Sequence, residues 1–109
     1  MSDLKPFFGK VKKKSNRQKA WDYMRRNRTF RVGDILVVLE ISEGSLKSLV
    51  RQLSQAKYIV KSNRVQAFRD KEFRLIKNTG IVCPSVITGT KFLYDSNTLK
   101  KVFMGKDNG

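Results

Sequence analysis

The segment DILVVLEISEGSLKSLVRQLSQAKYI, residues 34–59, constrains the fold most, because two apolar runs in it flank a short polar stretch, SEGS. Its second half has a clear helical period. Leu46, Leu49, Val50 and Leu53 recur at positions i, i+3, i+4 and i+7, which places them on one face of a helix. Ser42 is a favourable N-cap for this helix, and the opposite face is small, polar and basic. The sequence therefore predicts a helix with one buried and one exposed face.

The first half of the segment contains ILVVLE, residues 35–40, which is apolar at five consecutive positions. A run of this kind predicts a second helix that is buried nearly all round. The sequence allows two alternatives for the start of this helix: Asp34 caps it, or Gly33 provides the turn into it.

A third helix is predicted upstream. Ser15 and Gln18 have the spacing of a capping box at a helix N-terminus. Ala20, Trp21 and Met24 then follow at helical spacing, so Trp21 is expected to anchor one face of the core.

Short strand signals lie on both sides of the helical segment. TFRV, residues 29–32, is β-branched or aromatic at three of its four positions, which favours a short strand or an extended connector. Residues 58–61 and 73–77 are two further strand candidates. The intervening residues 62–72 carry turn formers at both ends and several basic side chains. We therefore expect a β-hairpin whose basic tip projects into solvent.

Charge is the strongest signal in the composition. The 109 residues include 24 Lys and Arg against 9 Asp and Glu, a net charge of +15. Eleven of the basic residues precede Val32, and nine lie between Glu43 and Lys77. This excess is larger than solubility requires, and it attracts polyanions. Nucleic acid is favoured as the partner over a membrane surface or an acidic protein.

The order of these elements resembles the winged helix-turn-helix family over about residues 15–78. Apolar residues occupy the five places expected in the two packed helices and just after their turn: Ile35, Leu39, Ile41, Leu46 and Leu49. EIS stands where the family often has a glycine, an apolar residue and a serine. TFRVGDI resembles the short strand and the start of the second helix, and AKYI resembles the start of the wing. The resemblance implies an α+β winged helix domain of three helices plus a β-hairpin wing, in the order α-β-α-α-β-β.

Two positions depart from the family pattern. Leu36 stands where a small residue is usual at the close crossing of the two helices, so these helices should lie slightly further apart. Glu40 stands at the turn where a glycine is usual, so its backbone must either avoid a positive φ or bear strain.

The resemblance also implies a DNA-binding surface. The helix after Ser42 would enter the major groove, and the wing would reach the backbone or the minor groove. The flanking arginines near the first helix would contact phosphates. The expected DNA-binding residues are Ser42, Gly44, Ser45, Lys47, Ser48, Arg51, Arg64, Arg69, Lys71, Arg28 and Arg31.

Several other classes of function are disfavoured. The chain has no histidine and a single cysteine, so the commonest general base, the commonest metal ligand and any internal disulfide are excluded. Cys83 lies in the apolar sequence GIVCPSV and is expected to be a small buried residue. We expect no enzymatic activity, no catalytic residues, no metal and no cofactor. No apolar run is long enough for a membrane span, and no secretory signal is recognised, so a cytoplasmic protein that associates with the nucleoid through DNA is expected.

Three regions follow from these observations: a flexible basic arm (1–14), the winged helix-turn-helix domain (15–78) and a C-terminal extension (79–109). The extension contains breakers and no sustained period, yet it is too apolar for a purely solvated tail. It is expected either to pack back on the domain or to mediate a homodimer. NTG and LYDSNT in it resemble the tails of winged-helix proteins from prophages and mobile elements.

The sequence thus predicts a bacterial or phage regulator of transcription that binds double-stranded DNA. Two alternatives stay open: a winged-helix interaction or assembly module that binds protein or RNA, and an architectural or replication-associated protein that binds DNA with low specificity.

Overall fold

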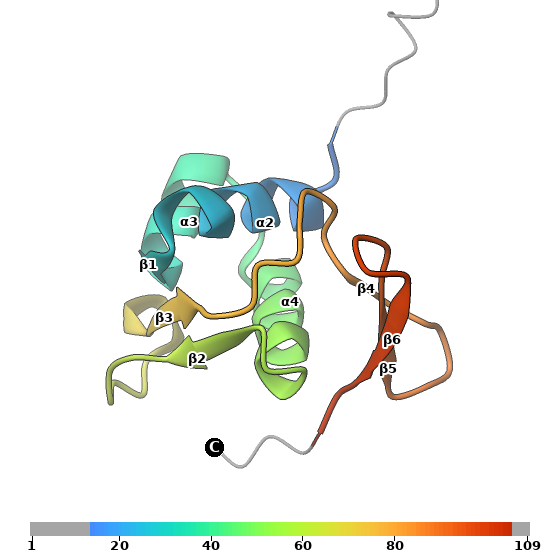
Figure 1. The fold of residues 1–109 in the computed structure, drawn as a ribbon. Coiled ribbons are helices and arrows are strands. Elements are labelled where there is room, and N and C mark those ends of the chain that lie inside the picture. The colour runs from blue at the N-terminus through green and yellow to red at the C-terminus, as the bar shows by residue number, and fades with distance from the viewer. Residues whose placement is uncertain (1–13, 106–109) are drawn as a thin grey trace, which may run out of the picture.

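Residues 14–105 are described by the computed structural model, and over this range the chain forms an α+β fold with three helices and two small antiparallel sheets (Figure 1). The predicted basic arm lies outside the described residues except for Lys14. The helices are α2 (Asn16–Asn27), α3 (Val32–Leu39) and α4 (Glu43–Gln55), with a short 3₁₀ helix η1 (Phe68–Asp70). The first sheet has the order β1-β3-β2, and its strands are β1 (Thr29–Arg31), β2 (Ile59–Lys61) and β3 (Glu72–Leu75).

Helix α2 begins where the sequence predicted. The Ser15 hydroxyl accepts a hydrogen bond from the Gln18 amide at 3.1 Å, and Trp21 is fully buried. The reciprocal half of the predicted capping box is wrong. The Gln18 side chain donates to the Ile81 carbonyl and accepts from the Cys83 amide, because the C-terminal extension lies against this turn of α2.

Two predictions about helix α3 are wrong, one about its start and one about its burial. Its N-cap is Arg31, so Gly33 and Asp34 both lie inside the first turn, and neither the predicted turn at Gly33 nor the predicted cap by Asp34 is observed. The helix is also not buried all round, since Val37 and Val38 are 72% and 60% exposed. The reason is geometric: α3 has only eight residues and packs against α2 and η1, so it turns part of its surface to solvent.

Helix α4 has the predicted N-cap and the predicted buried stripe. The Ser42 hydroxyl accepts from the Ser45 amide at 3.2 Å, and Leu46, Leu49, Val50 and Leu53 are buried. Between α3 and α4, Glu40 adopts the left-handed conformation with φ 53° and ψ 43°. Of the two possibilities that the sequence left open, the backbone strain is the one observed.

The predicted hairpin forms the first sheet together with β1. Strand β3 is central and antiparallel to both neighbours, with Phe30 opposite Phe73 and Ile59 opposite Leu75. These four side chains are buried and close the core beneath the helices. Residues 62–71 form the connecting loop, which contains η1.

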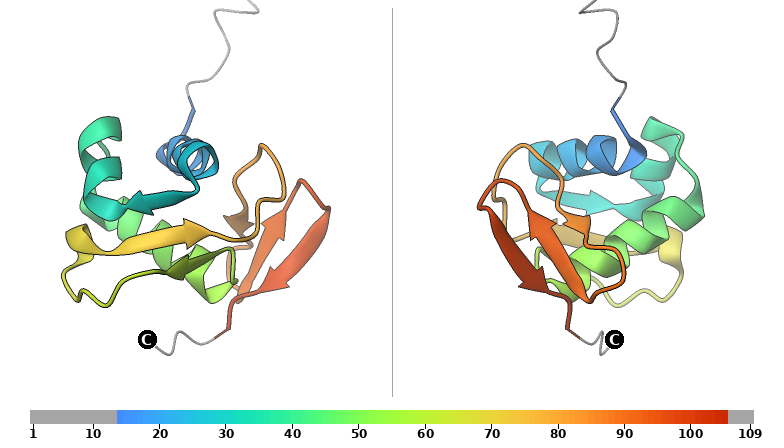
Figure 2. Two further views of the ribbon diagram at one scale, coloured as in Figure 1. Left: turned by 60° about the vertical axis from the view of Figure 1, so that its left-hand side comes forward. Right: turned by 90° about the vertical axis from the view of Figure 1, so that its right-hand side faces the viewer.

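The C-terminal extension folds into the second sheet, with the order β4-β5-β6: β4 (Ser85–Val86), β5 (Phe92–Asp95) and β6 (Lys100–Phe103). Figure 2 shows this sheet set apart from the first one, beside α4. The inward residue Leu93 is fully buried, and Val86 and Val102 pack against the same core.

Side chains from α2 hold the start of the extension. Arg17 donates to the Pro84 carbonyl and to the Gln52 side chain of α4, both at 2.7 Å. The Trp21 indole donates to the Gly80 carbonyl at 3.0 Å. Gly80 has φ 145°, and a Cβ there would come within 2.8 Å of the Asn97 side chain, so both the backbone and the space require glycine.

Asp95 joins the two sheets. Its side chain is fully buried, and one of its oxygens accepts from the hydroxyls of Tyr58 and Thr79, both at 2.6 Å. The other oxygen accepts from the Asn97 amide at 2.9 Å. Tyr58 directly precedes β2, so this carboxylate connects the end of β5 with the base of the hairpin.

The hydrogen bonds decide the ionisation of Asp95. Burial by itself would raise the pKa of this carboxyl, but the donors Thr79, Tyr58 and Asn97 outweigh it and hold the pKa below its ordinary value of 3.8. The same arrangement acts in the opposite direction on the phenol, because burial and the neighbouring carboxylate raise the pKa of Tyr58.

Replacing Glu40 by glycine is expected to stabilise the fold. Glycine adopts the left-handed conformation without a Cβ penalty, so the free energy of unfolding should rise by about 0.5–1 kcal/mol after the entropy lost by glycine is subtracted. Urea denaturation followed by circular dichroism measures this. Glu40→Ala is the control, since it removes the charge and keeps the strain. A Glu40→Gly variant less stable than the parent would contradict the interpretation.

The Asp95 network predicts a loss of stability in acid. A carboxyl whose folded-state pKa is lowered contributes stability above about pH 3.8, and this contribution disappears as the pH falls through the folded-state pKa. Asp95→Asn should therefore cost about 1–3 kcal/mol at pH 7, and the difference from the parent should shrink in acid. Asp70→Asn, which alters an exposed carboxyl, should stay within about 0.5 kcal/mol of the parent. Parallel pH profiles of the parent and Asp95→Asn would contradict the assignment.

Candidate nucleic-acid interface

The exposed face of α4 carries small and basic side chains. Gly44, Lys47, Ser48 and Arg51 line a shallow hollow of about 240 Å³ along its N-terminal two-thirds. A Cβ on Gly44 would meet no atom within 4 Å, so this part of the helix is fully open to a partner. The buried stripe on the opposite side fixes which residues point outward.

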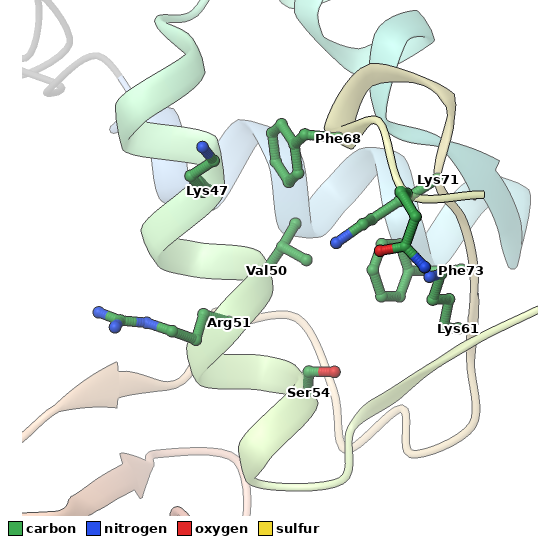
Figure 3. A pocket seen from close by; sticks show the side chains of 9 residues that line it. Lys47, Val50, Arg51, Ser54, Lys61, Phe68, Lys71 and Phe73 are labelled. Carbon is green, nitrogen blue, oxygen red and sulfur yellow. The ribbon is translucent and has the colours of Figure 1, made fainter. Parts of the chain in front are cut away.

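A groove runs between α4 and the hairpin and has a volume of about 480 Å³ (Figure 3). We call it the α4–hairpin groove. Its lining residues come from α4, from β2, from the connecting loop and from β3: Lys47, Val50, Arg51, Ser54, Lys61, Gln66, Phe68, Lys71 and Phe73.

The α4–hairpin groove is strongly positive. Four of its lining residues are cations and none is a carboxylate, and its apolar lining consists of the partly exposed Phe68 and the nearly buried Val50 and Phe73. Lys47 Nζ lies 5.4 Å from the centroid of the Phe68 ring, a cation–π contact that links α4 to η1. The groove is therefore complementary in charge to an anionic ligand.

Two carboxylates in these elements pair with arginines that do not line the groove. Arg69 Nε donates to Glu43 at 3.3 Å, which links η1 to the first turn of α4. Arg31 lies 4.0 Å from Glu72 across the first sheet. Glu43 and Glu72 are therefore paired with Arg69 and Arg31, and among residues 14–105 none of the lysines that line the groove forms an ion pair.

The hairpin loop is held in shape by its own hydrogen bonds. The Asn63 side chain donates to the Asp70 carbonyl at 3.0 Å and accepts from the Glu72 amide at 3.2 Å. Ser62 donates to Glu72 through both its amide and its hydroxyl. These hydrogen bonds hold together the two ends of the loop, next to Lys61 and Lys71.

The residues predicted from the sequence fall into three sets. The fold brings Gly44, Lys47, Ser48, Arg51 and Lys71 together at α4 and the groove. Ser42 and Ser45 lie at the start of α4, but their hydroxyls are hydrogen-bonded to each other at 2.9 Å as part of the cap. The remaining four lie outside the groove: Arg64 and Arg69 in the hairpin loop, Arg28 at the end of α2, and Arg31 at the end of β1.

Sequence reasoning missed Lys61, Gln66 and Phe68 as members of the groove. Lys61 could have been found from alternation, since it follows the buried Ile59 by two residues and therefore faces the same side. Phe68 gave a weaker signal, as a single aromatic residue within a basic loop. Nothing in the sequence indicated that η1 would bring it over Lys47.

The other reactive side chains take no part in this surface. Cys83 is buried as predicted, and burial raises the pKa of its thiol to about 11. Across residues 14–105, no three His, Cys, Asp or Glu side chains form a group able to hold a metal ion. The helices in this range are also too short or too polar to traverse a lipid bilayer.

Comparison of the chain with protein-family models, with curated proteins and with solved structures gave no match.

Proposed function

We propose that residues 15–78 form a winged helix-turn-helix domain that binds duplex DNA and acts, without enzymatic activity, as a regulator of transcription in the cytoplasm. The observation that carries the proposal is the α4–hairpin groove, which has four cations, no carboxylate and an open helix face beside it.

The arrangement of the elements supports the winged-helix interpretation. The chain order α2, β1, α3, α4, β2, β3 matches the family, and β1 pairs with the second hairpin strand, β3. In this interpretation α3 is the supporting helix, α4 is the recognition helix, and residues 62–71 are the wing. Glu40, Ile41 and Ser42 make the turn between the two helices.

The physical fit to duplex DNA follows from dimensions and charge. The major groove is about 12 Å wide and accepts an α-helix with its side chains. In this pose, Gly44 and Ser48 allow close approach of α4, while Lys47 and Arg51 reach base edges. Lys61 and Lys71 then face the phosphates at the rim, where a point charge is sufficient for binding.

Replacing Lys47 or Arg51 by alanine should weaken binding to a selected duplex by roughly 1–3 kcal/mol for each base that the variant can no longer reach. The measurement is fluorescence anisotropy on duplexes recovered by selection from random DNA. Lys57→Asn is the matched control: it also removes one positive charge, lies outside the groove, and keeps a residue that tolerates the φ of 67° at this position. If Lys57→Asn weakens binding as much as Lys47→Ala, α4 is not the recognition helix.

Lys61→Ala and Lys71→Ala should act differently from the α4 variants. Each should weaken binding to all duplexes about equally and reduce the slope of log affinity against log salt by about 1. Binding by six or more phosphate contacts should fall roughly 10³-fold between 50 and 200 mM salt.

The same experiments separate the alternatives. Strong salt-dependent binding without enrichment of any sequence would contradict the regulator and favour an architectural or replication-associated protein that binds DNA with low specificity. Absence of duplex binding at about 50 mM salt would contradict DNA binding and favour a protein or an RNA as the partner of the groove.

A further inference from the structure

The outward face of the second sheet carries aromatic side chains that do not belong to the core. Phe92 and Tyr94 of β5 lie opposite Phe103 and Lys101 of β6, respectively, and all four alternate with inward-facing residues. We call this set the aromatic sheet face. Phe103 is 57% exposed and Tyr94 is 36% exposed.

The geometry of this face leaves two rings free to accept a flat partner. Phe92 meets Phe103 edge-on, with ring centroids 5.5 Å apart and planes at 62°, so it supports the ring of Phe103. Tyr94 is diagonal to Phe103 across the strand pair, a relation that separates the two by roughly 7–8 Å. Lys101 is the residue opposite Tyr94 on β6, and its Nζ lies 5.1 Å from the centroid of Phe92.

The positive charge of residues 79–105 favours an anionic partner. Lys91, Lys100 and Lys101 are exposed, and Asp95 is the one acidic residue between 79 and 105. Asp95 is fully buried in the network with Tyr58 and Thr79, so this stretch presents three cations and no accessible carboxylate. A second copy of the same face would bring these lysines against one another.

We propose that the aromatic sheet face is a second binding site, which stacks unpaired bases of a single-stranded nucleic acid on Phe103 and Tyr94. Lys101, and with it Lys91 and Lys100, contacts the phosphates of the same strand. Bases in a duplex are stacked on one another and offer no free ring face, so this site takes single strands and the α4–hairpin groove takes duplex. The two sites are independent of each other.

The test compares three probes by fluorescence anisotropy at about 50 mM salt: oligothymidine, a chain of abasic units with the same number of phosphates, and a blunt duplex. Oligothymidine should bind more tightly than the abasic chain. Phe103→Leu and Tyr94→Leu, which stay apolar but lose the ring, should each weaken oligothymidine binding roughly 5-fold to 100-fold. Lys101→Gln should reduce the single-strand salt slope by about 0.7.

Controls separate stacking from folding and from charge. Tyr94→Phe keeps the ring and should bind oligothymidine within about twofold of the parent. The melting temperature of each variant should match that of the parent, and the leucine variants should keep their affinity for the blunt duplex. Lys47→Ala should show the reverse, with weaker duplex binding and unchanged stacking. The failure of one site is therefore distinguishable from the failure of the other.

Four results would overturn the proposal. Equal binding of oligothymidine and the abasic chain would show that binding depends on the phosphate charge and not on base stacking. Full oligothymidine binding by Phe103→Leu and Tyr94→Leu would remove the rings from the site. Sedimentation that reveals a dimer in the parent and a monomer in Phe103→Ser would assign the face to a second copy of the chain. Binding to phosphatidylserine vesicles that disappears in the same variant, without single-strand binding, would assign it to a lipid surface.

Discussion

One buried carboxylate holds the two halves of this protein together. Asp95 sits at the end of β5 and accepts hydrogen bonds from Tyr58, which precedes β2, and from Thr79, at the start of the extension. A buried charge is tolerated only when its hydrogen bonds are satisfied, and here burial and bonding occur together. Because the donors come from both halves, neither the second sheet nor the base of the hairpin can shift without breaking this network. The extension is therefore part of the fold.

This attachment also fixes the orientation of α4. Arg17 of α2 binds Gln52 near the C-terminal end of α4 and the Pro84 carbonyl of the extension, and Gly105 donates its amide to the Gln55 carbonyl. These contacts occupy the last turns of the helix, so its first turns carry the open surface. The basic groove and the aromatic sheet face then lie on separate elements, which gives the molecule two chemically different surfaces.

Two features of α3 and the turn after it are energetically unfavourable. Glu40 bears the cost of a left-handed backbone between α3 and α4, where glycine would not. Val37 and Val38 expose their side chains on α3, and nothing among residues 14–105 explains why they are apolar. Both features lie in α3 or in the turn that follows it, and none of these residues lines the α4–hairpin groove.

The sequence by itself determined the local features of this protein. The N-caps at Ser15 and Ser42 and the buried stripe of α4 were predicted correctly, because they depend on neighbouring residues and on the period of a helix. The excess of positive charge likewise needs no fold. The tertiary structure alone decided the exposure of Val37, the approach of Phe68 to Lys47, and the second sheet with its Asp95 network. They depend on which side of a short helix finds a neighbour, or on contacts such as Lys47 with Phe68, 21 positions apart, and Tyr58 with Asp95, 37 positions apart. The period of a helix or a strand does not indicate contacts at these separations.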